Sequence, residues 1–261
     1  MEKFIKALLL TENYWFVIAY LLMYIVFPFL NVAIHGMNKK QHLMCCVTLL
    51  FVFSFIHNLI YFKDYGNVKG GYSFLWFCIL YIIAAYFRLY IPERSKYQKW
   101  MIPTYIICCL GVYAERFLAY IITPHIFGKV QLTSLFYSYN SILIVPASLC
   151  LFQFFRGISV SNKRISSVIR FIAPLTFAVY LIHEHVEFRI FLWKWIDMEQ
   201  YADSAFLILI VLGISLSIFI VCCAIEYMRR WIFCKIKITN TINIICDCVQ
   251  MNIMKCFNSK I

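Results

Sequence analysis

The chain is poor in charged residues and in glycine, and both shortages restrict its class. Only 14% of its 261 residues are charged, 63% are hydrophobic, and 8 glycines stand beside 25 phenylalanines and 18 tyrosines. This composition excludes an ordinary soluble domain. The apolar segments are about twenty residues long, which is the length of a membrane-spanning helix and too long for a barrel strand. We therefore predict an all-α, polytopic membrane protein.

Several signatures of soluble enzymes and of secretion are also missing. The sequence holds no GxSxG nucleophile elbow and no phosphate-binding GxxxxGK[ST] loop. It has no CxxC pair, and most of its twelve cysteines lie in apolar runs, where thiols behave as small hydrophobic groups. We accordingly predict no metal site, no disulfide framework and no bound cofactor. The lysine-flanked apolar run near the start is too short for a signal-peptide core.

Apolar runs bounded by charge clusters predict seven transmembrane helices. They cover residues 14–34, 43–62, 73–91, 101–123, 132–155, 168–188 and 204–225. Pro174 lies within the sixth run and predicts a kink there. Beyond the seventh run the sequence becomes basic and aromatic. We therefore divide the chain into a membrane domain over residues 1–230 and a basic, irregular cytoplasmic tail over residues 231–261.

The distribution of lysine and arginine between alternate loops predicts the orientation. One side carries 14 of these residues and the other carries 8, and the last loop of the second side is acidic. The positive-inside rule places the first side, with the C-terminus, in the cytoplasm. With seven spans the N-terminus then lies outside. The net charge of +12 is thus explained by topology and by contact with membrane lipid, and not by nucleic-acid binding.

The most informative stretch is 171–187, which reads FIAPLTFAVYLIHEHVE. Ionisable groups are costly at membrane depth, so His183 and Glu184 at the end of this apolar run are candidates for a functional site. Helical spacing would place Thr176, Tyr180 and Glu184 on one face, with His183 and Glu187 beside it. An alternative interpretation is that His183–His185 only marks the boundary between membrane and water.

Polar residues in other predicted helices lie at a similar depth. They are His57, Asn58, Glu115, Arg116 and Asn140, whereas Arg88 lies near the inner end of its span. One shared cavity that faces outward explains these residues more economically than several separate defects in contact with lipid. The alternative is that Glu115 and Arg116 form a short interfacial loop and that His57 is a core histidine with a local partner.

Four stretches carry a resemblance to a known family. They read YWFVIAYLLMYIVFPFLN (14–31), GGYSFLWFCILYIIAAYFRLY (70–90), YNSILIVPASLCLFQFF (139–155) and IAPLTFAVYLIHEH (172–185). Together they resemble acyltransferase family 3, whose integral-membrane enzymes O-acylate cell-surface polysaccharides and related glycans. The resemblance implies a larger bundle with both ends in the cytoplasm, acetyl-CoA as the usual donor and a sugar hydroxyl as the acceptor. Seven spans and an external N-terminus are what would remain if the first helices of that bundle were missing.

The chain departs from the family in two motifs. The family's catalytic signature is a basic residue eleven positions before a histidine, and none of the six positions that could supply it is basic: Tyr24, Asn31, Cys46, Ala114, Ile172 and Pro174. The family's RxxR element, which is associated with donor handling, is also absent, since no two of the nine arginines are three apart. The base expected from the resemblance is therefore missing from this sequence.

The remaining candidates follow from what acyl transfer requires, which is a thioester donor, a base for the acceptor hydroxyl and a group that stabilises the oxyanion. We expect His183 to be an auxiliary base with Glu184 as its partner. The expected substrate-binding residues are Tyr14, Trp15 and Asn140 near the outer mouth, and Arg88, whose guanidinium suits a CoA phosphate. A snorkelling role at the inner interface is the alternative for Arg88.

The apolar runs predict a multi-pass protein of the cell membrane, and the resemblance implies that it moves an acyl group, acetyl in the usual case, from acyl-CoA to a hydroxyl of a cell-surface polysaccharide or related glycan. The expected partners are membrane lipid, acyl-CoA, the glycan acceptor and a separately encoded N-terminal part. Two alternatives stay open. The chain could be an inactive fragment or an accessory membrane protein, as the missing basic residue suggests, and a transporter is supported only by polar residues at membrane depth.

Overall fold

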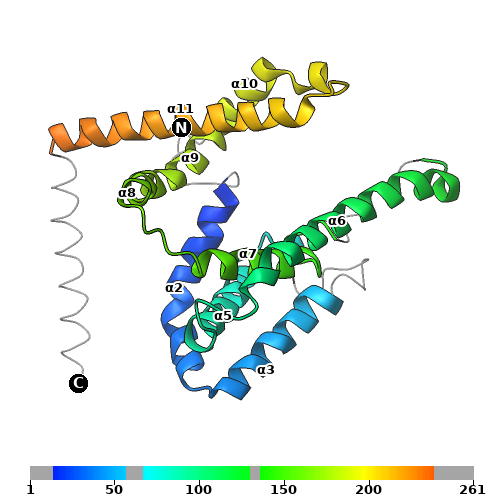
Figure 1. Ribbon diagram of the computed structural model, residues 1–261, viewed down its shortest axis with the longest axis vertical. Coiled ribbons are helices and arrows are strands. Elements are labelled where there is room, and N and C mark those ends of the chain that lie inside the picture. The colour runs from blue at the N-terminus through cyan, green and yellow to red at the C-terminus, as the bar shows by residue number, and fades with distance from the viewer. Residues whose placement is uncertain (1–13, 57–66, 130–135, 238–261) are drawn as a thin grey trace, which may run out of the picture. The chain divides into compact units, whose positions relative to one another are not determined.

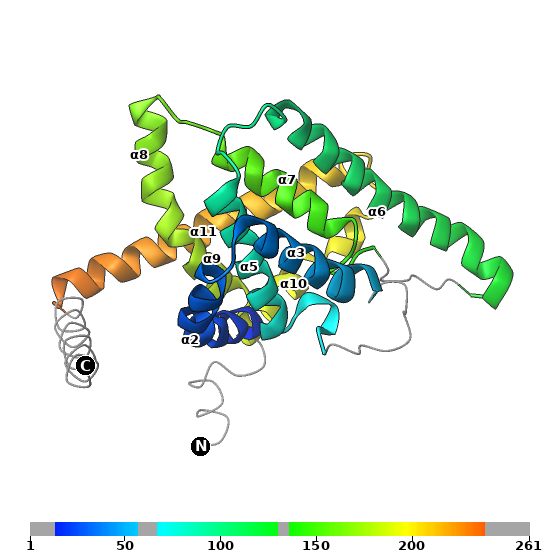
Figure 2. The ribbon, with the colours of Figure 1, turned by 90° about the horizontal axis from the view of Figure 1, so that it is seen from below.

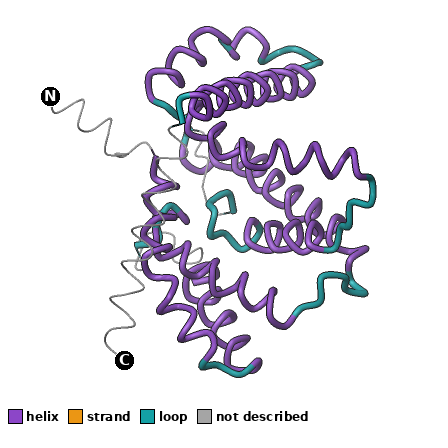
Figure 3. The backbone as a smooth tube through the Cα atoms, turned by 90° about the vertical axis from the view of Figure 1, so that its left-hand side faces the viewer, coloured by secondary structure: helices purple, strands orange, loops and turns teal. Residues whose placement is uncertain are grey.

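The computed structural model describes residues 14–56, 67–129 and 136–237 (Figure 1). Within these ranges every regular element is a helix, which confirms the all-α prediction (Figure 3). The chain divides into two compact units, Met1–Ser159 and Val160–Ile261.

Five helical segments are long and apolar enough to cross a membrane, which confirms the polytopic class. They are α2 (Trp15–His35), Lys39–Ile56, α6 (Gln98–Phe127), Lys163–His183 and α11 (Leu207–Lys235). The second comprises α3 (Lys39–Leu50) and the π-helix η2 (Phe51–Ile56). Two shorter apolar helices, α5 (Phe74–Tyr90) and α7 (Ile144–Arg156), lie where the third and fifth spans were predicted. Residues 57–62 of the second predicted span lie outside the described ranges.

The core of the first unit is formed on one face of α5. Trp76, Ile79 and Ile83 are spaced at three and four residues, so they share a helical face, and each is almost completely buried. On α2, in contrast, the apolar side chains of Phe29 and Val32 are about three quarters exposed. Apolar side chains can remain exposed on a membrane helix because lipid, and not water, surrounds them.

Helix α5 begins where the sequence provides a cap, because the Ser73 hydroxyl accepts a hydrogen bond from the Trp76 amide at 3.3 Å. It is preceded by the short 3-10 helix η3 (Lys69–Gly71). The next two helices of the unit, α6 and α7, pack along each other (Figure 2). The residues that begin α5 and the turn that precedes α7 both belong to a candidate site described below.

Helix α7 begins later than predicted. The fifth span was expected to run as one helix over 132–155, but residues 136–143 form turns and α7 starts at Ile144. The reason is Ser141, whose buried hydroxyl donates to Phe136 O at 2.8 Å and accepts from Ile144 N at 3.1 Å. Such local bonds compete with the helix. With 13 residues, α7 is about 20 Å long and is shorter than the hydrocarbon core of about 30 Å.

A buried glutamine ties the far end of α7 to the turn that follows α5. Gln153 is 3% exposed, and its amide nitrogen donates to Pro92 O at 2.9 Å and to Glu93 O at 3.1 Å. Its side-chain oxygen accepts from Arg156 Nη1 at 2.8 Å. All polar atoms of this side chain are therefore paired, as a buried amide requires.

Replacing Gln153 by alanine is expected to destabilise the first unit. The substitution leaves two loop carbonyls without their donor, and we expect a loss of about 2–3 kcal/mol of unfolding free energy. Urea unfolding of the detergent-solubilised protein, followed by far-UV circular dichroism, would measure it. Gln200→Ala is the matched control, because that exposed amide makes a single bond to Ile196 O. Equal midpoints for the two variants would contradict the role assigned to Gln153.

The second unit begins with an amphipathic helix and a kink. Helix α8 (Lys163–Ile172) carries Arg164 and Arg170 among apolar residues, and Asn162 caps its start. The 3-10 turn η4 (Ala173–Leu175) then separates α8 from α9 (Thr176–His183), which confirms the kink predicted at Pro174. Helix α10 (Val186–Ile196) and the short η5 (Met198–Tyr201) precede α11.

Helix α11 continues to Lys235, five residues beyond the predicted domain boundary at 230. In both views α9 lies against α11 (Figures 1 and 2). Residues 238–261 of the predicted tail lie outside the described ranges.

Candidate functional site

The sixth predicted span is interrupted at the residues that drew attention in the sequence. Helix α9 ends at His183, His185 has an extended backbone with φ −60° and ψ 128°, and α10 starts at Val186. The prediction of one continuous helix over 168–188 is therefore wrong, and Glu187 does not share a helical face with Thr176 and Tyr180. The residues predicted as an outer loop after this span include α10. Sequence missed the break because neither glycine nor proline marks it.

His183 has one ring nitrogen occupied and one open. Its Nδ1 lies 2.7 Å from Val179 O, one turn earlier in α9, so Nδ1 carries the proton and Nε2 carries the lone pair. Nε2 is 3.6 Å from Glu184 Oε1, too long for a hydrogen bond but suited to an ion pair once the ring is protonated. The side chain is 36% exposed. This arrangement is that of a base with a carboxylate beside it.

Arg189 completes this group from the other side of the break. Its Nη1 donates to Glu184 Oε2 at 3.0 Å, and the guanidinium carries further N–H donors that can stabilise an oxyanion. Sequence analysis had placed Arg189 in a loop. Only a break between α9 and α10 brings a residue five positions after Glu184 back to it. We call His183, Glu184 and Arg189 the break cluster.

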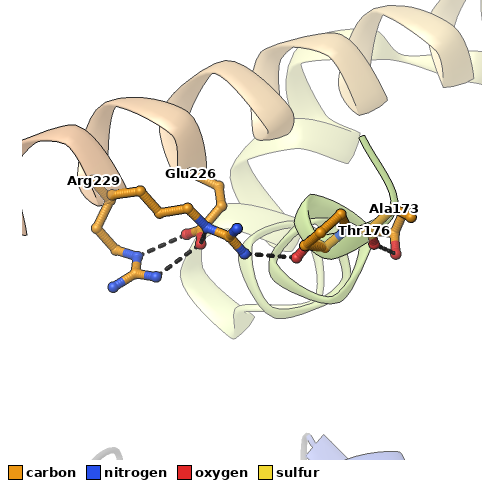
Figure 4. A network of polar contacts seen from close by, with 6 residues as sticks. Ala173, Thr176, Glu226 and Arg229 are labelled. Atoms are coloured by element: carbon orange, nitrogen blue, oxygen red, sulfur yellow. Dashed lines mark hydrogen bonds and ion pairs between the residues drawn. The ribbon is translucent and has the colours of Figure 1, made fainter. Parts of the chain in front are cut away.

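A second polar network fixes α9 on α11 (Figure 4). Glu226 is 3% exposed and accepts hydrogen bonds of 2.7 Å from both Arg229 and Arg230. Arg230 also donates to Pro174 O at 2.7 Å, and Thr176 Oγ1 donates to Ala173 O at 2.8 Å. The kink is thereby held to α11. In the break cluster, His183 follows Pro174 by nine residues, which is about 13 Å along a helix.

The first unit holds a separate group of aromatic residues. Ring centroids are 4.5 Å apart for Trp15 and Tyr72, 5.0 Å for Tyr72 and Tyr139, and 6.0 Å for Trp15 and Tyr139. The two tyrosines are about half exposed. Three of the four stretches singled out in the sequence thus begin at one place. We call Trp15, Tyr72 and Tyr139 the aromatic platform.

The platform combines one residue predicted from the sequence with two that were not. Burial is the main cause that raises the pKa of Tyr72, and the neighbouring Tyr139 is the second cause. A neutral phenol can both donate and accept a hydrogen bond. Trp15 was predicted as a substrate-binding residue, and Tyr14 precedes it, half-buried, at the start of α2. The partner tyrosines were not predicted, although Tyr139 is the first residue of one quoted stretch and Tyr72 is the third residue of another.

Two glycines let the platform close. Gly70 O accepts a hydrogen bond of 3.0 Å from Tyr139 N. Gly71 has φ +96°, and a Cβ there would lie 2.5 Å from Tyr139 Cβ and 3.2 Å from Asn140 N. A side chain at this position would therefore be both strained and without space. The pair of glycines is what brings the start of α5 against the turn before α7.

The other predicted residues lie apart from this surface. Asn140 is fully buried, and its amide donates to Phe53 O at 2.8 Å, so it ties the turn next to Tyr139 to Phe53. Arg88 is exposed near the end of α5, 15 residues or about 22 Å from Ser73 at its start. Their roles in binding substrate stay predictions.

Of the polar residues expected to share one cavity, some can be placed. Glu115 and Arg116 lie inside α6, so the alternative that they form an interfacial loop is wrong. The Arg116 guanidinium lies 4.6 Å from the centroid of the Tyr137 ring. His57 and Asn58 lie outside the described residues.

A comparison with protein families gives the class. The model of the acyltransferase 3 family, described as an acyltransferase domain, matches residues 4–229. The chain therefore belongs to this family and is a membrane acyltransferase in the general sense. No curated protein and no solved structure matches it.

Proposed function

We propose that the protein is an O-acyltransferase of the cell membrane, which moves an acyl group, acetyl in the simplest case, from acyl-CoA to a hydroxyl of a surface polysaccharide. The observation that carries this proposal is the break cluster. A histidine with an open Nε2, a carboxylate 3.6 Å away and a guanidinium on that carboxylate stand together where an apolar helix is interrupted. Such ionisable groups are costly at membrane depth and are expected to have a function.

The geometry supports the following reaction. His183 Nε2 takes the proton of the acceptor hydroxyl as its oxygen attacks the thioester carbonyl, and Arg189 stabilises the negative charge on the carbonyl oxygen. The carbon–sulfur bond then breaks, and the imidazolium returns its proton to the leaving CoA thiolate. Glu184, 3.6 Å from the same Nε2, stabilises the imidazolium electrostatically between these two steps. This cluster would supply the base that the missing family signature does not.

The first unit carries side chains whose chemistry suits the two substrates. Trp15, Tyr72 and Tyr139 offer flat apolar faces with polar edges, which suit the apolar faces and the hydroxyls of a sugar. Arg88 has an exposed guanidinium, which suits a CoA phosphate. Asn140 acts indirectly, by holding the turn that carries Tyr139.

The direct test is transfer by the purified chain. The protein would be reconstituted in proteoliposomes with radiolabelled acetyl-CoA and surface polysaccharide, and label in the polysaccharide would be counted. We expect more label than with the His183→Ala variant. If the chain transfers nothing, both alone and with a separately encoded N-terminal part, the protein is instead an accessory or inactive member of the family.

The aromatic platform gives a more specific expectation. Tyr139→Ala removes one stacking face, and we expect KM for the polysaccharide to rise about three- to tenfold with kcat unchanged, because uniform binding is lost. Tyr113→Ala is the matched control, since that tyrosine of α6 is 70% exposed and stacks only on the neighbouring Phe117 among the ring contacts of the described residues. Initial rates at varied polysaccharide would measure both. A fall in kcat with unchanged KM would contradict the platform's role in binding.

A further inference from the structure

The second unit contains an apolar groove that the reaction above does not use. It lies between α10 and α11 and has a volume of about 660 Å³. Its lining is almost wholly hydrophobic and includes Phe188, Leu192 and Trp195 from α10, and Gly213, Ser217 and Cys222 from α11. Pockets of this volume hold small-molecule ligands in many proteins.

The α11 side of the groove includes three small residues, Gly213, Ser217 and Cys222. A Cβ at Gly213 would meet nothing within 4 Å. Small residues on membrane helices ordinarily allow a second helix to approach closely, but here α10 stays apart and the space is open. Ser217 turns its hydroxyl to its own helix, where it donates to Gly213 O at 2.8 Å, so its polar group is satisfied. The groove therefore offers an apolar surface along its length.

The length of the groove corresponds to one lipid chain. Along α11 the lining runs from Ile210 to Cys222, twelve residues or about 18 Å. Half of a bilayer's hydrocarbon core is about 15 Å thick, so an acyl chain of membrane length would fill this space. An acetyl group would occupy only a small part of it.

One end of the groove lies close to the break cluster along the chain. Phe188 lines it and directly precedes Arg189, and it follows Glu184 by four residues. On α11 the same end of the groove is marked by Cys222, four residues before Glu226, whose partners Arg229 and Arg230 are the next cations along the helix. The second unit thus contains the apolar groove, the base His183 and the two guanidinium groups of Arg229 and Arg230.

A long-chain acyl-CoA has the same three kinds of part, which are an apolar chain, a reactive thioester and anionic phosphates. We propose that the groove between α10 and α11 binds the acyl chain of a long-chain acyl-CoA donor, with the thioester at the break cluster and the phosphates towards Arg229 and Arg230. The inference rests on the proposed function, narrows its donor class and assigns the CoA phosphates to Arg229 and Arg230 instead of Arg88. It predicts that the protein prefers a fatty acyl group to acetyl.

Chain-length dependence tests the inference. Palmitoyl-CoA and acetyl-CoA would be compared as donors with the full chain in proteoliposomes. We expect kcat/KM for palmitoyl-CoA to exceed that for acetyl-CoA by about tenfold or more, since apolar contact along the chain adds binding energy. Gly213→Trp places a large side chain in the groove from a position where a Cβ meets nothing within 4 Å, and we expect it to lower the palmitoyl value about tenfold while the acetyl value changes by less than about twofold.

Leu216→Trp is the matched control, because Leu216 lies on the same helix, is 59% exposed and does not line the groove. It should leave both donors unchanged. If acetyl is transferred and Gly213→Trp has no effect on palmitoyl transfer, the groove holds a bilayer lipid or a second copy of the chain, and the inference is overturned while the proposed function stands.

A binding measurement tests the groove even if the protein transfers no acyl group. If neither donor is used, the proposed function fails, and equilibrium binding of palmitoyl-CoA still shows whether the groove binds an acyl chain. Tighter binding of palmitoyl-CoA than of acetyl-CoA, abolished by Gly213→Trp and kept by Leu216→Trp, would support the groove. Equal binding in the wild type and both variants would refute it.

Discussion

Replacing His183 by alanine is expected to lower kcat for acyl transfer by about 10²- to 10⁴-fold, the usual contribution of a positioned general base. The expectation follows from the open Nε2, which is held in place by the bond from Nδ1 to Val179 O. KM for both substrates should change little, because the ring acts on the reacting hydroxyl and not on the rest of the substrate. Steady-state rates in proteoliposomes at varied substrate would measure kcat and KM separately.

His185→Ala is the matched control for this variant. His185 is two residues away and exposed, so the same change of residue type is made without touching the break cluster. We expect its kcat to stay within about twofold of the wild type. If both histidine variants lost the same activity, the effect would come from the distorted break and not from a base at His183.

Gly71→Ala is expected to be the most damaging small substitution in the first unit. It combines a positive φ with a Cβ that would lie 2.5 Å from Tyr139 Cβ, and we expect a loss of about 3 kcal/mol or more in unfolding free energy. The aromatic platform should separate at the same time. Chemical unfolding followed by circular dichroism gives the stability, and KM for the polysaccharide reports the platform.

Gly128→Ala isolates the contribution of the backbone in this comparison. Gly128 has φ +68°, but a Cβ there would meet nothing within 4 Å. Its variant should therefore lose only the conformational term, about 1–2 kcal/mol. Equal losses for the two glycines would show that the contact with Tyr139 does not constrain the start of α5.

The fold class could be predicted because it depends on composition and on the length of apolar runs. Both are local properties, and the structure places a helix in each predicted run where the chain is described. Pro174 could likewise be assigned to a kink from its missing amide proton. The late start of α7 could not, because it depends on a hydroxyl of Ser141 that must be buried before it competes with the helix.

The candidate sites were only half visible in the sequence. Charge within an apolar run identified His183 and Glu184. Arg189 was missed because its contact with Glu184 needs a break that no glycine or proline announces. Tyr72 and Tyr139 were missed for another reason, since they lie 67 residues apart and meet only when the turns before α5 and α7 pack together.

Chemical rescue tests the central claim, that the interrupted helix carries the base for acyl transfer. The His183→Gly variant removes the ring from a side chain that is 36% exposed, so added imidazole can reach its place. We predict that imidazole restores transfer in this variant in proportion to its concentration and leaves the wild type unchanged. Transfer that stays at the variant's level at every imidazole concentration, or a variant as active as the wild type without imidazole, would contradict the claim.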